Sequence, residues 1–212
     1  MALQFPTSQA FLNAVVRNDL YSFIQAFFPT VSGGESLMLN WHLEAMAYAL
    51  TRVMNGEIRR LIITMPPRHL KSICASVAFP AFLLGHDPTR RIICVSYSDP
   101  LARKHANDCR ALIRSDRYRR LFPHTRLSLD KDSETEFMTT RRGFRLATSV
   151  GGTLTGRGGN LIVIDDPMKP QDAHSETMRE NVKQWYGNTL ISRLDNKTLN
   201  SHRRGNAAAT YR

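Results

Sequence analysis

The apolar residues of this chain are spaced in two ways, and the first spacing predicts helices. Over residues 7–28 and 41–54 they recur at steps of three and four, which gives each helix one buried face. A third helix is expected over residues 72–84, which begin with small side chains. A fourth is expected over residues 98–115, where a serine and a proline mark the start.

The second spacing predicts strands. Residues 60–65, 91–97 and 160–164 are short, nearly continuous apolar runs bounded by polar residues, as in parallel strands that are buried on both faces. Residues 136–148 read as a hairpin with an Arg-Arg-Gly turn. Strands that alternate with helices in this way predict an α/β fold with a mostly parallel sheet flanked by helices.

The first predicted strand leads into candidate chemistry. It ends in two prolines and a basic turn that reaches Lys71 and Ser72 at the start of the next helix, the layout of a phosphate-binding loop. In that layout Lys71 contacts the outer phosphates of ATP and the Ser72 hydroxyl binds Mg²⁺. The turn consists of Pro67, Arg68, His69 and Leu70. Because Met65 and Leu70 stand where the usual pattern has glycine, an ordinary strand-to-helix turn is the alternative.

A second motif follows the third apolar run, which ends in Asp165 and Asp166. Ligands of open α/β sheets bind at the carboxyl ends of the strands. There Asp165 would hold Mg²⁺ and Asp166 would orient the attacking water. A capped turn is the alternative for this motif taken alone. Combined with Lys71 and Ser72 in the same order, it favours a nucleotide site.

Two further features concern ligands. The net charge of +11 indicates a polyanionic partner, with nucleic acid first and a membrane surface second. Residues 101–126 hold eight Lys or Arg against two Asp, so a binding face is favoured over a merely solvated basic surface. The candidate DNA-binding residues on this face are Arg103, Lys104, Arg110 and Arg114. Trp41 is a candidate for stacking on adenine, with a core tryptophan at a helix start as the commoner alternative.

Several function classes are disfavoured. No apolar run approaches the roughly 20 residues of a membrane helix. The first residues lack the basic and apolar regions of a signal peptide, so none is expected. Of the two polyanionic partners, nucleic acid is favoured and no membrane partner is expected. Three widely spaced cysteines without metal-ligand spacing indicate reduced core thiols.

Four ordered segments together resemble a known family, the ATPase domain of the large terminase subunit of tailed bacteriophages. The segments are residues 65–72 with Pro-Pro-Arg-His, 95–99, the glycine-rich 151–159, and 161–167 with Asp-Asp-Pro. The similarity extends over residues 41–196. It implies a P-loop ATPase domain over residues 41–196, while the residue pattern outside that range predicts an N-terminal helical segment (1–40) and a basic tail (197–212).

The resemblance implies an ASCE-type fold with strand order 5-1-4-3-2 and hydrolysis of Mg-ATP. The hydrolysis would power packaging of double-stranded DNA into proheads through a portal ring. The implied partners are this ring, a small terminase subunit and further copies in a homo-oligomeric ring, in the cytoplasm of a bacterial host carrying a phage or prophage. Asp166 would stand where the family more often has Glu. Arg68 would stabilise charge on the γ-phosphate, and Arg157 would act on a neighbouring subunit.

The sequence departs from the family at its end. Residues 197–212 carry four Lys or Arg, no acidic residue and no strand-like apolar run, which predicts a disordered tail. On this prediction the fourth strand of the sheet and the nuclease domain are missing. The sheet would be incomplete at its C-terminal end, and the chain would be a truncated or frameshifted product that hydrolyses ATP poorly, so its ATPase activity is uncertain.

Two other functions compete with the motor ATPase. One is a non-catalytic, basic nucleic-acid-binding remnant with a vestigial nucleotide site. The other is a different P-loop ATPase such as a helicase. The combination of Pro-Pro-Arg-His with Leu-Thr-Gly-Arg-Gly over residues 154–158 argues against the second.

Overall fold

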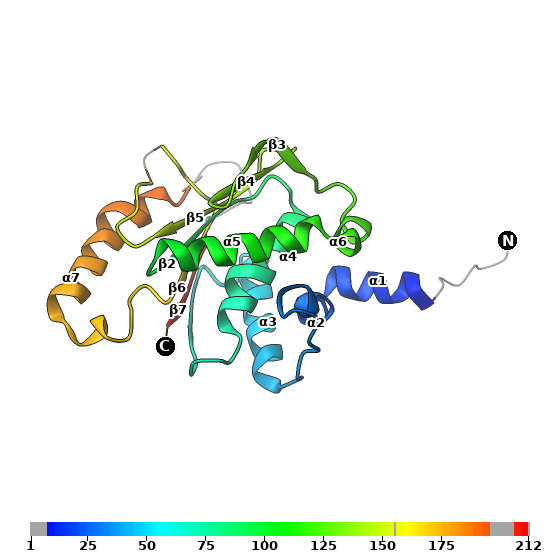
Figure 1. Cartoon of the computed structure of the whole chain (residues 1–212), viewed down its shortest axis with the longest axis horizontal. Coiled ribbons are helices and arrows are strands. Elements are labelled where there is room, and N and C mark those ends of the chain that lie inside the picture. Colours follow the sequence, from blue (N-terminus) through cyan, green and yellow to red (C-terminus); the bar gives the residue numbers. More distant parts are fainter. Residues whose placement is uncertain (1–7, 155, 196–205, 212) are drawn as a thin grey trace.

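The centre of the molecule is a seven-stranded sheet with the order β1-β7-β6-β2-β5-β4-β3 (Figure 1). The computed structural model describes residues 8–154, 156–195 and 206–211. The strands are β1 Arg60–Thr64, β2 Arg91–Ser96, β3 Leu127–Asp132, β4 Glu136–Thr139, β5 Phe144–Ser149, β6 Leu161–Asp165 and β7 Asn206–Tyr211. The five strands from β1 to β5 in this order run parallel, and β4 and β3 continue the sheet antiparallel. The predicted α/β fold with a mostly parallel sheet is confirmed.

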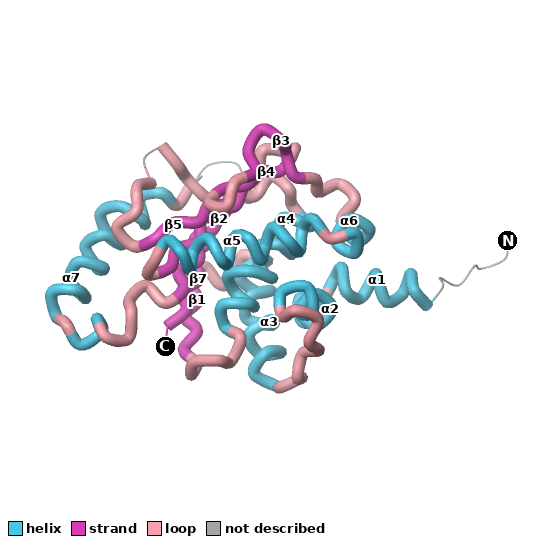
Figure 2. The backbone as a smooth tube through the Cα atoms, viewed as in Figure 1, coloured by secondary structure: helices cyan, strands magenta, loops and turns pink. Residues whose placement is uncertain are grey.

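Helices cover both faces of this sheet (Figure 2). They are α1 Ser8–Asn18, α2 Leu20–Val31, α3 Trp41–Met54, α4 Phe79–His86, α5 Asp99–Arg114, α6 Asp116–Leu121 and α7 Glu176–Trp185. Short π and 3₁₀ turns complete them: η1 Ile73–Ala78, η2 Asp172–His174, η3 Tyr186–Leu190 and η4 Ile191–Arg193. The single helix predicted over residues 7–28 is two helices. The break lies at Asp19, whose carboxylate caps α2 by accepting the Ser22 N–H at 2.7 Å.

Alternation along the central strands divides the apolar residues into two cores. On β2 and β6, Cys94 and Val163 face the larger core, which includes residues of α2, α3, α4 and α5. Their neighbours Ile93 and Ile162 face a smaller core with Leu190 of η3. The strands are therefore buried on both faces, as their continuous apolar sequences predict. Since Phe23 of α2 belongs to the larger core, the N-terminal helices pack directly on the sheet domain.

The helix after β1 contains a π-helical stretch. It begins at Lys71, continues as η1 and runs on as α4. The Phe79 N–H bonds the Cys74 carbonyl five residues earlier, which widens the turn. Such π segments occur often at functional sites. Here the π-helical stretch begins at Ile73, directly after the predicted phosphate loop.

The prediction of a missing fourth strand is wrong. β7 lies between β1 and β6 and pairs parallel with both, with Ala208 opposite Leu61 on one side and Val163 on the other. The order β1-β7-β6-β2 is therefore the 1-4-3-2 part of the expected arrangement. The segment Asn-Ala-Ala-Ala-Thr-Tyr was missed because it lacks long apolar side chains. Between two strands, backbone pairing on both edges determines its conformation more than its intrinsic propensity does.

The remainder of the tail expected to be disordered, residues 197–205 and 212, lies outside the described residues. On the far side of β1, the described part of the chain contains no further strand. β1 is consequently an edge strand, and the Ile62 side chain is 68% exposed.

Candidate nucleotide-binding site

The two motifs predicted from the sequence meet at the carboxyl ends of β1 and β6. Lys71 begins the helix after β1, and Asp166 directly follows β6. The Lys71 Nζ donates to the Asp166 Oδ1 at 2.9 Å, and the two side chains are only 6% and 11% exposed. The lysine and the paired aspartates thus form one partly enclosed charged cluster on the sheet edge.

The backbone around this ion pair has an unusual conformation. Arg68, Leu70 and Asp166 have positive φ angles of 63°, 58° and 45°. Leu70 therefore adopts the left-handed conformation for which the usual pattern provides glycine, at a cost of about 1–2 kcal/mol. Its half-buried side chain packs against the larger core, and this contact offsets part of that cost. The loop keeps a glycine-like course without the glycine.

Asp165 is the last residue of β6 and is more deeply buried than the neighbouring Asp166. Its carboxylate is buried, and its Oδ2 accepts a hydrogen bond from the Ser76 hydroxyl at 3.1 Å. The His105 Nδ1 lies 3.5 Å from the same oxygen. Burial lowers the pKa of His105, and the negative charge of Asp165 opposes that shift. The structure therefore adds two residues, on η1 and α5, to the site expected from the sequence.

A buried arginine completes the lower part of the cluster. Arg145 of β5 is fully buried, and its Nη2 donates to the Ser76 carbonyl at 3.0 Å. The Nε and Nη1 of Arg145 have no hydrogen-bond partner in the described part of the chain. Burial raises the pKa of the neighbouring Cys94 thiol, which the Arg145 charge opposes. Sequence reasoning missed Ser76, His105 and Arg145; the available signal was the spacing of Ser76, four residues after Ser72.

Oxygen donors suited to Mg²⁺ are present at this place. Ser72 is half-buried at the start of the helix, one turn before Ser76, and Asp165 supplies a carboxylate. Within the described ranges no group of three or more His, Cys, Asp or Glu could hold a metal by itself. Mg²⁺ is commonly held by one or two protein oxygens together with phosphate oxygens and waters. The donor set fits that mode of binding.

Trp41 lies beside the predicted phosphate loop and lines a groove together with residues of β1. It is 77% exposed, so its alternative interpretation as a core tryptophan is wrong. Trp41, Pro66 and His69 line one groove of about 600 Å³ along the edge of β1. The His42 ring lies between those of Trp41 and His69, at centroid distances of 6.3 and 5.3 Å. An aromatic surface therefore borders the predicted phosphate loop.

Within the loop, Pro67 and Arg68 are exposed. The His69 Nδ1 lies 2.9 Å from the Pro67 carbonyl oxygen, a contact that holds the turn together. Arg68 makes no ion pair with any residue that the structure describes. It is positioned at the mouth of the site, next to Leu70 and Lys71.

Arg157 pairs with Glu136 of β4 and not with residues of the nucleotide site. Its Nη2 donates to the Glu136 Oε2 at 2.7 Å, and its guanidinium lies 5.9 Å from the Phe144 ring centre. Lys131 contacts the same glutamate oxygen at 3.0 Å. The structure thus brings Arg157 to β4 and β5 and not into contact with Lys71. Its role toward a second subunit stays a prediction.

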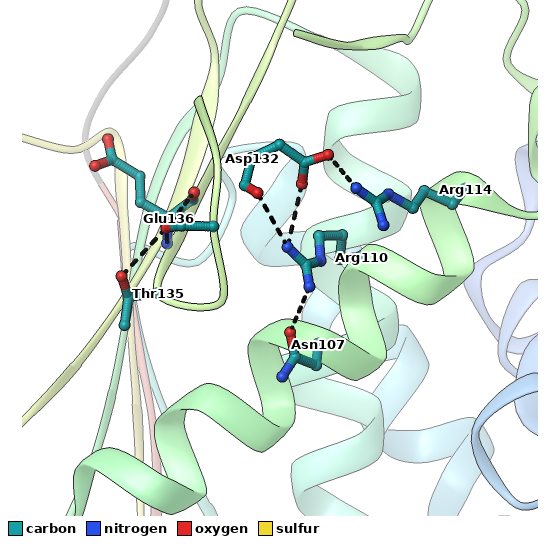
Figure 3. Close-up of polar contacts among 7 residues, drawn as sticks. Asn107, Arg110, Arg114, Asp132, Thr135 and Glu136 are labelled. Carbon is teal, nitrogen blue, oxygen red and sulfur yellow. Dashed lines mark hydrogen bonds and ion pairs between the residues drawn. The ribbon is translucent and has the colours of Figure 1, made fainter. Parts of the chain in front are cut away.

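The predicted basic face on α5 is partly neutralised within the chain (Figure 3). Arg110 and Arg114 both bind Asp132 of β3, and Arg110 also bonds Asn107. Lys104 pairs with Asp108 at 2.7 Å along the helix. In the described part of the chain Arg103 alone among the four candidates makes no ion pair. Contact of these residues with DNA stays a prediction.

The fold and the site together define the class. A parallel sheet whose first strand leads into a lysine at a helix start, facing aspartates at the end of a nearby strand, is the architecture of P-loop nucleotide-binding domains. None of the helices in the described ranges is long and apolar enough to cross a membrane.

Comparison with known proteins gives the particular version of that fold. The large terminase of bacteriophage HK97 superimposes with a TM-score of 0.53 at 12% identity, over 92% of this chain and 37% of the HK97 protein. The large terminase ATPase domain of Thermus phage P74-26, solved as a mutant, gives 0.47 and 14%, over 87% of this chain and 68% of that domain. No family model and no curated protein matches the sequence. The chain therefore has the fold of part of a bacteriophage large terminase, and it spans little more than a third of the HK97 protein.

Proposed function

We propose that this chain binds ATP with Mg²⁺ at the Lys71 site, hydrolyses it and so serves as the ATPase domain of a phage DNA-packaging motor. The observation that carries the proposal is the 2.9 Å contact between Lys71 and Asp166. It joins the ends of two strands that are separated in the sheet by β7. The motor assignment is supported by the similarity of the fold to that of the HK97 large terminase.

The ion pair has a direct consequence for nucleotide binding. In a P-loop site the lysine binds the outer phosphates, so an arriving triphosphate competes with Asp166 for the Lys71 ammonium. Binding therefore separates the Asp166 carboxylate from Lys71 at the moment when a water must be oriented for attack. Ser72 and Asp165 would hold Mg²⁺, which neutralises charge on the phosphates when it is bound.

Two aromatic and cationic groups extend the site beyond the phosphates. Trp41 lines the groove along β1 and offers a flat surface for the adenine ring. Arg68 lies at the mouth of the loop, where its charge would stabilise the γ-phosphate within the same subunit.

The motor assignment includes partners. Double-stranded DNA would contact the α5 face with Arg103, Lys104, Arg110 and Arg114. The portal ring, a small terminase subunit and other copies of this chain in a ring would complete the machine in the host bacterium. In such a ring Arg157 would leave Glu136 to serve a neighbouring site.

Hydrolysis is tested with Asp166→Asn. Asparagine tolerates positive φ and keeps a polar side chain, but it cannot act as a base. We expect ATP binding to persist and Mg-dependent hydrolysis to fall roughly 100-fold or more, the usual scale of a lost catalytic base. The control is Asp130→Asn, which alters an exposed carboxylate on β3. Unchanged hydrolysis in Asp166→Asn would refute the role of this residue.

The nucleic-acid-binding remnant is the second candidate, favoured by the basic face on α5. It predicts DNA binding that is insensitive to ATP and to Lys71→Ala. Nucleotide titration of the parent protein separates the two functions, because a remnant with a vestigial site binds DNA but no ATP.

A further inference from the structure

Two buried polar groups lie against one oxygen of the Asp165 carboxylate at the end of β6. They are the Ser76 hydroxyl on η1 and the His105 ring on α5. All three residues are buried. The Ser76 hydroxyl donates to the Asp165 Oδ2 at 3.1 Å, and the His105 Nδ1 lies 3.5 Å from the same atom.

Arg145 in turn holds the backbone of Ser76. The Arg145 Nη2 donates to the Ser76 carbonyl at 3.0 Å, and Arg145 is fully buried on β5. Among the described residues the Arg145 guanidinium hydrogen-bonds no carboxylate, and burying a charge in this way is costly. Its position is understandable if it keeps the wide π turn, and with it the Ser76 hydroxyl, at a fixed distance from β6.

We propose that Ser76 and His105 are positioning residues, which hold the Asp165 carboxylate in the orientation that Mg²⁺ with nucleotide requires, and that Arg145 positions Ser76. This inference rests on the proposed function, because it assigns a task within the same site. Ser76 and His105 act through Asp165 and contact neither phosphate nor metal.

The physical reason is the freedom of a short carboxylate. An aspartate at a strand end can rotate about two side-chain bonds, and only some orientations direct an oxygen at a metal. The hydrogen bond from Ser76 and the close approach of the His105 ring to the same oxygen restrict that rotation before the ligand arrives. Residues that orient metal ligands in this way typically contribute 10- to 100-fold to metal affinity.

A purely structural role would give a different result. If the cluster only satisfied buried polar groups, removing the Ser76 hydroxyl would lower stability and leave the Mg²⁺ dependence of nucleotide binding unchanged. The measured quantity is therefore the ratio between nucleotide affinity in saturating Mg²⁺ and in excess EDTA. A loss of stability shared by all ligand states does not change this ratio.

The experiment titrates the full chain with a fluorescent ATP analogue under both conditions. For Ser76→Ala and His105→Leu we expect the Mg²⁺-dependent gain to fall roughly tenfold or more, while affinity in EDTA stays within about twofold. The matched control is Thr125→Val, which removes another buried hydroxyl, one that donates to the Leu84 carbonyl at 2.9 Å. We expect this control to keep the parental ratio.

His105→Asn provides the conservative variant, since an asparagine amide can occupy the place of the ring Nδ1. We expect it to recover most of the gain lost in His105→Leu, and thermal unfolding shows whether each variant folds. If Ser76→Ala does not fold, the two His105 variants decide alone.

Each outcome bears on a different claim. A parent protein that binds no nucleotide in either condition refutes the proposed function. A parent with a Mg²⁺-dependent gain that is unchanged in Ser76→Ala and His105→Leu overturns the positioning role alone. Failure of His105→Asn to recover any of the gain overturns the assignment of His105.

Discussion

Two clusters in this molecule pair basic side chains with an aspartate from another part of the chain. They differ in how far the paired side chains are exposed to solvent. At the sheet edge Lys71 meets Asp166 where both side chains are nearly enclosed. On α5, Arg110 and Arg114 share Asp132 of β3, and Arg114 is half exposed (Figure 3). An enclosed pair interacts strongly and tolerates no loss of a partner, whereas an exposed pair is weakened by solvent and salt.

This difference in exposure suggests different roles for the two clusters: a ligand site at Lys71 and Asp166, and an adjustable binding surface around Asp132. Lys71 and Asp166 pair where little solvent reaches them, so an anionic ligand must compete with Asp166 for the Lys71 ammonium. Asp132 competes with any polyanion for Arg114, whose side chain is 50% exposed, and for Arg110, whose side chain is 18% exposed. The first pair is therefore expected to govern whether a ligand binds, and the second to adjust how tightly one binds.

The largest effect is expected at the enclosed pair. Lys71→Ala removes the charge-assisted donor of the enclosed pair and should lower ATP affinity roughly 10- to 100-fold. Lys104→Ala is the control, because Lys104 is exposed and pairs with Asp108 on α5. Equilibrium nucleotide titration compares the two variants. Equal losses in both would erase the distinction between the enclosed and the exposed pair.

A smaller effect is expected at the more exposed cluster, in which Arg110 and Arg114 pair with Asp132. Asp132→Asn removes the charge that Arg110 and Arg114 share, so both become available to phosphates. We expect tighter binding of double-stranded DNA and a salt dependence steeper by up to about two units in the log–log slope. The control Asp130→Asn changes a neighbouring carboxylate that bonds Ser128 instead. Weaker DNA binding by Asp132→Asn would mean that Asp132 orients the arginines for DNA.

The smallest effect concerns the backbone beside the enclosed pair. Leu70→Gly and Leu70→Ala both remove the packed side chain, but only glycine relieves the positive φ of 58°. We expect the glycine variant to be more stable than the alanine variant by about 1 kcal/mol in chemical denaturation.

The same pair of variants tests the loop as a ligand site. Glycine lets the backbone approach the phosphates more closely, so nucleotide affinity should rise above that of the parent. An alanine variant as stable as the glycine variant would show that the left-handed backbone at Leu70 carries no strain.

The enclosed site was largely predictable from the sequence. Parallel strands end at one edge of a sheet, so an apolar run followed by Lys71 and another followed by Asp165 are brought together by topology alone. His105 and Arg145 were not predictable, because a histidine within a helix or an arginine within a strand does not reveal which buried group it faces. For Ser76 the sequence offered only its spacing of four residues from Ser72.

The exposed pair was not predictable for a related reason. β3 carries little apolar patterning that points inward, and Leu129 within it is 97% exposed. Its register against β4 is irregular between Leu127 and Asp132. The basic residues of α5 could be read from the sequence, but the aspartate that neutralises them could not. β7 was missed because its two neighbours, rather than its composition, make it a strand.

The position of β7 sets an order for biosynthesis. The strand that joins β1 to β6 is encoded after all other described strands, so a ribosome releases it last. Until then the emerging polypeptide has two open inner edges, which can pair wrongly with other chains. The site around Lys71 can therefore assume its final shape only after residues 206–211 have left the exit tunnel, and a chaperone that shields those edges would raise the yield of native protein.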